Sequence, residues 1–143
     1  MKADNYIKLE FPARAVNEGF ARSAAAAFVS QLDPTLTELG DIKTAVSEAV
    51  TNAVVHAYPK EIGVIQMRLR ILSGDVLEIV VKDKGVGIPD VDRARTPLYT
   101  TGGEDRSGMG FTIMEGFMDK LRVRSAPGRG TTITMRRHLL RRS

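Results

Sequence analysis

The sequence predicts an α+β fold, a two-layer sandwich in which helices cover one face of a mixed, mostly antiparallel sheet. Apolar residues recur at helical spacing between Ile42 and Ala57, whereas in residues 64–72 they alternate with polar ones at strand spacing. Short turn segments join strand-like stretches into two hairpins, and hairpins pair antiparallel. The sheet face that carries Arg68 and Arg70 is expected to lie in water.

The first half of the chain is expected to form one strand and two helices. Residues 6–13, YIKLEFPA, alternate apolar and polar side chains and predict the first strand. The alanine-rich residues 17–32 predict a helix with Asn17 as its N-cap. Residues 33–58 predict a second helix, begun by the Asp33-Pro34 turn. The apolar stripe of this second helix would hold it against the sheet.

The second half is expected to be mostly sheet. Residues 64–72 and 76–83 predict a hairpin that turns through Ser73-Gly74-Asp75. Residues 85–110 are rich in Gly, Pro, Thr and charged residues, and a loop of this length in a small domain is typical of a functional segment. Residues 111–118 are expected to form a short helix. Residues 120–125 and 130–137 are expected to form the two strands of a closing hairpin.

Composition places residues 1–143 in one globular domain. The chain is 43% hydrophobic and 27% charged, as in ordinary globular proteins, and it is long enough to bury a core. It has no cysteine, which excludes disulfides and thiolate metal sites and suits a cytoplasmic protein. No apolar run is long enough to span a bilayer or to act as a signal peptide. We therefore expect a cytoplasmic protein without a membrane partner.

The net charge of +4 is partly due to the C-terminal tail, residues 138–143. A basic tail can contact nucleic acid or an acidic protein, but most such tails are simply solvated. A nucleic-acid surface would interleave arginines with aromatic residues, and the strand of Arg68 and Arg70 has no aromatic residue. Direct nucleic-acid binding is therefore not expected, and the tail remains without an assigned role.

Glu48 and Asn52 lie four residues apart in the otherwise apolar stretch SEAVTNAVVHAY. On a helix they would be neighbours beside the apolar stripe. The asparagine oxygen could bind Mg²⁺, which prefers oxygen ligands, and the carboxylate could act as a general base. Half-exposed helix faces carry such pairs routinely, so the pair alone is weak evidence.

Two glycine clusters flank the long loop. Asp83-Lys84-Gly85-Val86-Gly87 follows a strand, and Gly108-Met109-Gly110 precedes a helix. Glycines let backbone N–H groups approach an anion closely, and a helix N-terminus favours negative charge. The chain has no Gly-Lys pair and so no Walker-type loop, and neither cluster gives G-x-G-x-x-G in a parallel βαβ unit. Ordinary turn chemistry remains an alternative for each cluster.

Asp83 is expected at the end of a strand, on the same face as Leu77, Ile79 and Val81. A carboxylate on the buried side of a sheet is costly unless it meets a donor. The exocyclic amine of adenine is one such donor, and Thr131 on the last strand could be a second polar contact. The alternative is an aspartate that caps the turn at the strand end.

These motifs, in this order, resemble the four boxes of the GHKL ATPase and kinase superfamily, which includes gyrase, MutL and the ATP domains of histidine kinases. The boxes are Glu48-x-x-x-Asn52, Asp83-x-Gly85-x-Gly87, Gly108-x-Gly110 and Gly130-Thr131-Thr132. Three longer stretches, residues 31–58, ARTPLYTT and RSGMGFTIMEGFMD, resemble the anti-sigma serine kinases of spore-forming bacteria, the anti-sigma-F group in particular. The resemblance runs from the first strand to about His138.

The resemblance implies a GHKL-type (Bergerat) sandwich that binds ATP or ADP with Mg²⁺ under a lid. It would make Glu48 the general base, Asn52 the Mg²⁺ ligand and Asp83 the acceptor for the adenine amine. The other nucleotide-binding residues implied are near the base or the phosphates: Gly85, Gly87, Arg106, Gly108, Gly110 and Thr131.

For function, the resemblance implies an ATP-dependent serine kinase that is also an anti-sigma factor. Such proteins form homodimers, hold an RNA polymerase sigma factor inactive and phosphorylate a serine of a STAS-type anti-anti-sigma protein. The sequence departs from the family at Gly102-Gly103, where a lysine-proline pair is expected, and in its basic charge. The alternatives are the equivalent kinase of a stress-response sigma system and a nucleotide-dependent binding module without phosphotransfer.

Overall fold

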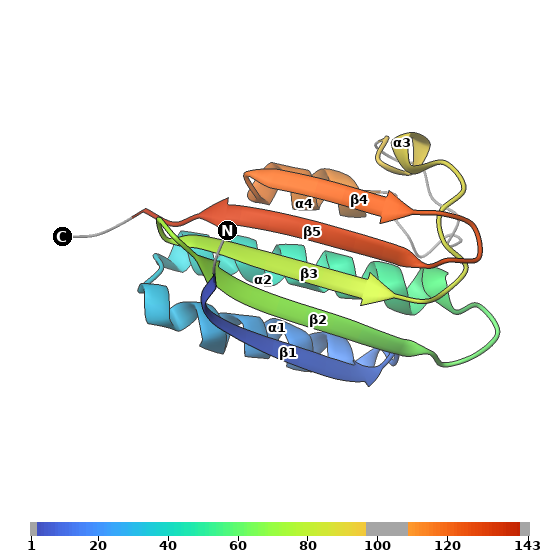
Figure 1. The fold of residues 1–143 in the computed structure, drawn as a ribbon, viewed down its shortest axis with the longest axis horizontal. Coiled ribbons are helices and arrows are strands. Elements are labelled where there is room, and N and C mark those ends of the chain that lie inside the picture. Colours follow the sequence, from blue (N-terminus) through green and yellow to red (C-terminus); the bar gives the residue numbers. More distant parts are fainter. Residues whose placement is uncertain (1–2, 97–108, 141–143) are drawn as a thin grey trace.

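A five-stranded sheet with the order β1-β2-β3-β5-β4 forms one layer of the protein (Figure 1). The structure, a computed structural model, describes residues 3–96 and 109–140. Strands β3 and β4 run parallel to each other, but β5 lies between them and is antiparallel to both. The expected α+β fold is confirmed, although every pairing in the described ranges is antiparallel. The strands are β1 (Ala3–Pro12), β2 (Val64–Leu72), β3 (Val76–Asp83), β4 (Lys120–Ser125) and β5 (Thr131–His138).

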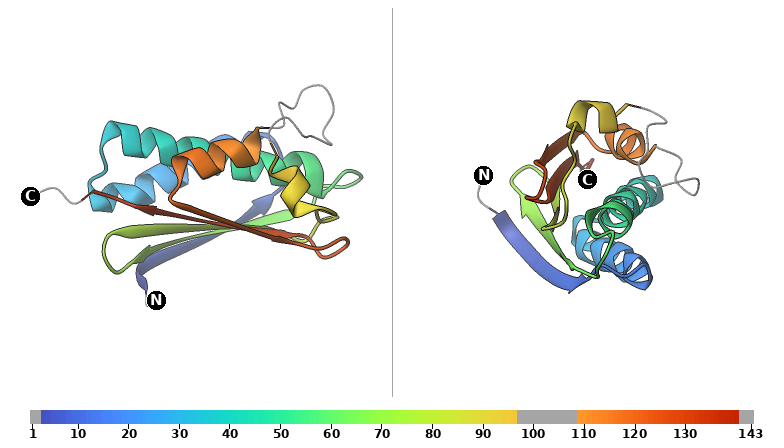
Figure 2. Two further views of the ribbon diagram at one scale, coloured as in Figure 1. Left: turned by 90° about the horizontal axis from the view of Figure 1, so that it is seen from above. Right: turned by 90° about the vertical axis from the view of Figure 1, so that its right-hand side faces the viewer.

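The helices form the second layer and cover one face of the sheet (Figure 2). Helix α2 lies in the centre of this layer and packs against α1 on one side and α4 on the other. A short helix, α3, lies within the segment that was expected to be an irregular loop. The helical elements are α1 (Val16–Val29), η1 (Ser30–Leu32), α2 (Leu36–Asn52), η2 (Ala53–Ala57), α3 (Val91–Ala94) and α4 (Gly110–Phe117).

Two expected helix starts are wrong. Helix α1 has Ala15 at its N-cap position with no side-chain cap, and the Asn17 amide instead donates to the carbonyl of Pro12 at 2.9 Å. Helix α2 begins after a Thr35–Glu38 capping box, in which each side chain bonds the other's backbone N–H. Asp33 has a φ of 52° and ends the preceding 3₁₀ turn. The Asp33-Pro34 segment is therefore a connection between helices.

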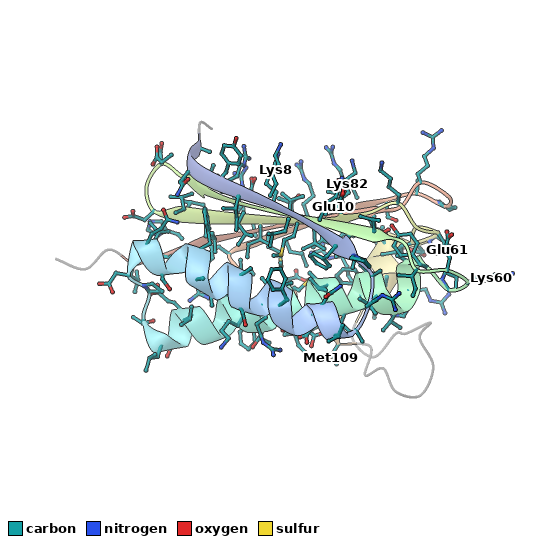
Figure 3. All side chains as sticks on the ribbon, turned by 90° about the horizontal axis from the view of Figure 1, so that it is seen from below. Lys8, Glu10, Lys60, Glu61, Lys82 and Met109 are labelled. Carbon is teal, nitrogen blue, oxygen red and sulfur yellow. The ribbon has the colours of Figure 1, made fainter. Side chains whose placement is uncertain are left out.

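The core lies between the two layers. The expected stripe of the second helix is buried throughout, from Ile42 to Ala57, and it faces strand residues that are 0–5% exposed. Residues that alternate with the strand core project from the other face of the sheet, which none of the described helices covers (Figure 3). We call this face the open face. No helix in the described part of the chain is long and apolar enough to cross a membrane.

Candidate active site

Glu48 and Asn52 lie one turn apart on α2, and both are half-buried. The buried Ala45, Ala49 and Val50 hold this part of the helix against the sheet. The α-helix ends at Asn52 and continues as the π-helical turn η2. Short π-helical insertions are often found at functional sites, because they change the direction in which the neighbouring side chains point. The expected neighbours on one helix face are thus placed together.

Helix α4 begins beside Glu48. A Cβ atom built on Gly110 would lie 3.2 Å from Oε2 of Glu48, so the carboxylate lies against the first turn of α4. The first N–H groups of a helix have no partner within the helix, and its N-terminus carries a partial positive charge. Glycine at this position leaves room between a carboxylate and a set of backbone donors. Gly108 and Arg106, which were expected to complete this part of the site, lie outside the described residues.

Asp83 ends β3 as a buried carboxylate with only 5% exposure. Its Oδ1 atom accepts the backbone N–H groups of Gly85 at 3.0 Å and Thr131 at 3.2 Å. Burial raises the pKa of Asp83, and these two hydrogen bonds only partly oppose that effect. Both bonds end on one oxygen, whereas a carboxylate has about four acceptor positions. The Asp83 carboxylate can therefore accept further hydrogen bonds, either from a ligand or from residues outside the described ranges.

Gly85 and Gly87 allow the segment after β3 to pack closely against the backbone of Ala57 and Ala126. A Cβ atom on Gly85 would lie 2.1 Å from the carbonyl oxygen of Ala57, and one on Gly87 would lie 2.0 Å from that of Ala126. Gly87 also has a φ of 78°, a conformation that favours glycine. Val86 donates its backbone N–H to Ala57 O at 2.8 Å. Within the described residues, Gly85 therefore lets the Asp83 segment lie against the end of η2, and Gly87 lets it lie against the turn between β4 and β5.

Thr131 is buried beside Asp83 and belongs to a hydrogen-bonded cluster that sequence reasoning missed. Its Oγ1 lies 2.9 Å from Oγ of Ser125, and the same Ser125 oxygen accepts the backbone N–H of Ile88 at 2.7 Å. Ser125 thus joins β4, β5 and the segment after Asp83. A serine at the end of a strand is too common to signal this role.

Tyr58 is the second residue that sequence reasoning missed. Its hydroxyl donates to the carbonyl of Val64 and accepts the backbone N–H of Lys84, both at 2.8 Å. The ring lies so close to Gly63 that a Cβ there would be 2.1 Å from a ring carbon. Tyr58 therefore fixes the residue next to Asp83 to the end of η2 and the start of β2.

Three segments thus converge at one end of the molecule: the α2–η2 junction, the first turn of α4 and the segment that follows β3. They bring together a carboxylate beside helix N–H groups, a side-chain amide and a buried carboxylate with spare acceptor capacity. This donor set fits a ligand with an anionic part and an amine-bearing part. No group of three or more metal-binding side chains occurs among the described residues.

Comparison with known proteins shows the family to which the chain is similar. Residues 11–137 match the family described as histidine kinase-like ATPase domain. A protein of Pasteuria penetrans named anti-sigma F factor is 56% identical over 133 residues, which are 92% of this chain and 89% of the relative. One of Caldanaerobacter subterraneus with the same name is 51% identical over 140 residues, 97% of each chain.

Solved structures show the same fold. The histidine kinase domain of a blue-light activated kinase from Erythrobacter litoralis superimposes with a TM-score of 0.59 and 25% identity, over 85% of this chain and 61% of that one. The RsbU and RsbW domains of a Mycobacterium tuberculosis protein give a TM-score of 0.67 at 20% identity, over 97% of this chain and 33% of that one. At these identities the structures bear on the fold rather than on the reaction.

Proposed function

This chain belongs to the histidine kinase-like ATPase domain family and, within it, to the anti-sigma F factors. On this premise we propose that it is an ATP-dependent protein serine kinase that also sequesters a sporulation sigma factor. The observation that carries the kinase part is the position of Glu48. Its carboxylate lies against the first turn of α4, with Asn52 one helical turn away. A site that only binds a nucleotide has no need of a base there.

Each residue of the site has a task in this proposal. The Asp83 carboxylate accepts a hydrogen bond from the adenine amine, with Gly85, Gly87 and Thr131 holding it in place. Asn52 supplies a side-chain oxygen to Mg²⁺. Backbone N–H groups at Gly110, together with Gly108 and Arg106, bind the phosphates. Mg-ATP, when bound, supplies the transferable phosphoryl group and the cation that offsets its charge.

Glu48 has the catalytic task. Its carboxylate accepts the proton from the serine hydroxyl of the protein substrate as that oxygen bonds to the γ-phosphorus of ATP, while the bond from this phosphorus to the β–γ bridging oxygen breaks and ADP leaves. Most of the rate acceleration is expected to come from positioning, because phosphoryl transfer depends mainly on alignment of the reacting groups and on charge neutralisation. Glu48 is held for this purpose on a helix whose opposite side is buried in the core.

The partners are part of the proposal and are supported by the similarity to proteins named anti-sigma F factor. We propose that the chain binds an RNA polymerase sigma factor, phosphorylates a serine of a STAS-type anti-anti-sigma protein, and acts as a homodimer in the cytoplasm. The equivalent kinase of a stress-response sigma system would use the same site residues and differ only in its partners. A binding module without phosphotransfer is the alternative from another class, and the presence of Glu48 counts against it.

The test is transfer of γ-labelled phosphate from Mg-ATP to a cognate anti-anti-sigma protein, with the parent and Glu48→Gln compared side by side. The parent should label a serine of the partner. The variant should bind ATP with parental affinity and transfer at least about a hundredfold more slowly, the usual contribution of a general base. Transfer by the variant at the parental rate would refute the assignment of Glu48, and no transfer by a parent that binds ATP would favour the binding module.

A further inference from the structure

The open face of the sheet carries a concentration of positive charge. Strand pairing places fifteen residues there in three rows that run across all five strands. These rows hold eight lysines and arginines but only two glutamates, a surplus of six positive charges. The whole chain has a net charge of +4, so the remaining residues together have a net charge of −2. The eight cations are Lys8, Arg68, Arg70, Lys82, Lys120, Arg122, Arg124 and Arg136.

One part of this charge is neutralised within the face. Glu78 is 2% exposed, and its carboxylate accepts from Nε of Arg70 at 2.7 Å and from Nε of Arg136 at 2.9 Å. Arg68 approaches the same carboxylate only at 3.7 Å. This cluster locks two arginines in place, and it leaves most of the cations without a counter-charge in the described part of the chain.

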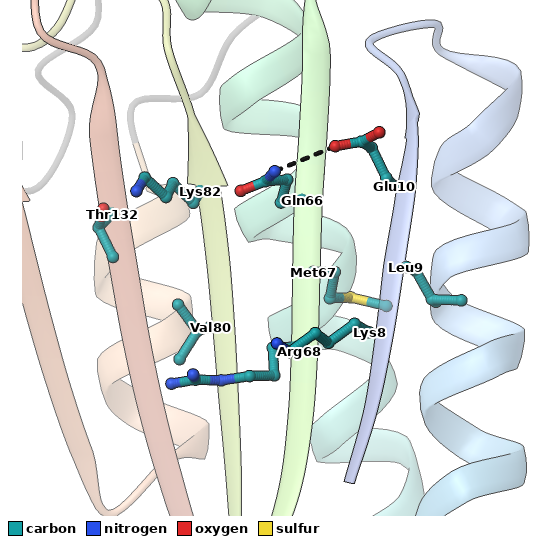
Figure 4. Close-up of a pocket in the computed structure, with 9 residues that line it drawn as sticks. All are labelled: Lys8, Leu9, Glu10, Gln66, Met67, Arg68, Val80, Lys82 and Thr132. Atoms are coloured by element: carbon teal, nitrogen blue, oxygen red, sulfur yellow. Dashed lines mark hydrogen bonds between the residues drawn. The ribbon is translucent and has the colours of Figure 1, made fainter.

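The other part surrounds a hollow of about 590 Å³ on the open face (Figure 4). Lys8, Arg68 and Lys82 are its cationic lining residues, from three neighbouring strands. Its one carboxylate, that of Glu10, is already bonded to the Gln66 amide at 3.0 Å. Nε of Arg68 is a buried donor with no acceptor in the described residues. The hollow therefore has donors and positive charge in excess of the acceptors that it contains.

From these observations we propose that the open face, centred on this hollow, docks an acidic segment of a partner protein. Carboxylates of such a segment would pair with Lys8, Lys82 and the guanidinium of Arg68, whose side chain is 40% exposed, while Val80 and the methyl group of Thr132 offer apolar contact between them. The interaction would be fast and salt-sensitive, as for other complementary charged surfaces. This surface is separate from the site of Glu48 and Asp83, because it lies on the face that the helices do not cover.

Two other occupants fit less well. A second copy in a two-fold interface would place one set of cations against another, which is unfavourable. Single-stranded nucleic acid binds through aromatic stacking platforms, and Tyr6 is the one aromatic residue in the three rows. An acidic protein segment meets neither objection.

The test uses a fluorescent ten-residue oligoglutamate peptide as the probe and measures its affinity by anisotropy at low ionic strength. The charge-reversed double variant Lys8→Glu/Lys82→Glu is compared with a control of the same net charge, Lys43→Glu/Lys60→Glu, whose residues lie off the open face. We expect about a tenfold or greater loss of affinity in the first variant and less than twofold in the control. Amide shifts on titration should map to Gln66, Val80 and Thr132.

Several results would overturn the proposal. They are equal affinity of parent and Lys8→Glu/Lys82→Glu, equal losses in both double variants, and tighter binding of a single-stranded decathymidylate than of the peptide. A shift in the monomer–dimer equilibrium of the first variant, seen by sedimentation, with peptide affinity unchanged, would instead assign the face to a second copy. ATP affinity, measured in parallel, should be parental in both variants. The outcome is therefore independent of whether the chain is a kinase.

Discussion

At the scale of single residues, Asp83 has the most unusual environment in the candidate site. It is a buried carboxylate that bonds two backbone N–H groups through one oxygen, and burial raises its pKa. In a folded protein such a group persists at a cost in stability, because the folded state binds its proton more tightly than the unfolded chain does. A cost of this kind is typical of residues kept for binding.

We predict that Asp83→Asn weakens nucleotide binding but leaves the fold intact. The amide would present donors where the adenine amine needs an acceptor, which should weaken ATP binding by about tenfold or more. The free energy of unfolding at neutral pH should not fall, because the variant no longer buries a charge. Titration calorimetry with Mg-ATP and thermal unfolding measure the two effects. Parental ATP affinity in the variant would show that Asp83 does not contact the base.

The pH dependence of ATP affinity gives the same residue a second test. The raised pKa means that Asp83 gains its proton at a pH above the ordinary value of 3.8. ATP affinity of the parent should therefore fall as the pH is lowered towards that value from above, since a protonated carboxyl loses acceptor capacity.

We predict that the hydroxyl of Tyr58, rather than its ring, holds the segment after Asp83 in position. Tyr58→Phe keeps the ring against Gly63 but removes both bonds, to Val64 and Lys84, that fix the segment after Asp83. We expect a loss of about 1–2 kcal/mol in the free energy of unfolding, with a weaker affinity for ATP. Denaturant unfolding and calorimetry would measure these. Unchanged values for both would show that the hydroxyl does not position this segment.

At the scale of elements, α2 joins the core to the site, and its start is set by the capping box. Thr35→Ala should lower the free energy of unfolding by about 1 kcal/mol, because the N–H of Glu38 loses its acceptor. Thr37→Ala is the matched control, since Thr37 lies in the same turn, is exposed and makes no cap. Urea unfolding of both variants measures the difference, and equal losses would mean that the cap contributes nothing beyond helix propensity.

The same element shows what the sequence could and could not predict. The stripe from Ile42 to Ala57 was recognisable because its period is a local property. The helix start was placed at Asp33-Pro34, although Thr35-Leu36-Thr37-Glu38 carries a capping-box pattern that competes with it. The π-helical turn after Asn52 has no sequence signature comparable to a cap. Its last residue, Ala57, contacts Gly85 and accepts the N–H of Val86, which lie far away in the sequence.

At the scale of the whole molecule, Glu78 ties the strands of the open face together. Burial by itself would raise the pKa of Glu78, but hydrogen bonds and charges from Arg70 and Arg136 outweigh it and hold the pKa below the ordinary value of 4.5. A lowered pKa stabilises the fold above that value, and the stabilisation is lost as the pH falls through the folded-state pKa.

Glu78→Gln should therefore lower the free energy of unfolding at pH 7 by about 1–3 kcal/mol, because two arginines lose a charged acceptor. The difference from the parent should shrink as the pH falls below 4.5. Chemical unfolding at a series of pH values measures this, with Glu61→Gln as an exposed control. A difference that stays constant down to acidic pH would contradict the assigned role of the charge.

The fold class could be predicted from the sequence, and so could candidate residues for the site, but the arrangement of these residues in space could not. Periodicity separated strands from helices, and the four boxes marked Glu48, Asn52, Asp83 and the glycines. Their convergence depends on contacts between segments far apart in the chain, such as Gly110 with Glu48 and Thr131 with Asp83. Ser125 and Tyr58 were missed for the same reason, since each acts through backbone groups that only the folded chain brings near.

A crystal structure of the parent with Mg²⁺ and a non-hydrolysable ATP analogue would show directly whether the nucleotide binds at the site of Asn52 and Asp83. We expect the adenine amine to donate to the Asp83 carboxylate, the side-chain oxygen of Asn52 to bind the metal ion, and the phosphates to lie at the N-terminus of α4. A nucleotide bound elsewhere, or bound here with its base away from Asp83 and its metal ion away from Asn52, would contradict it.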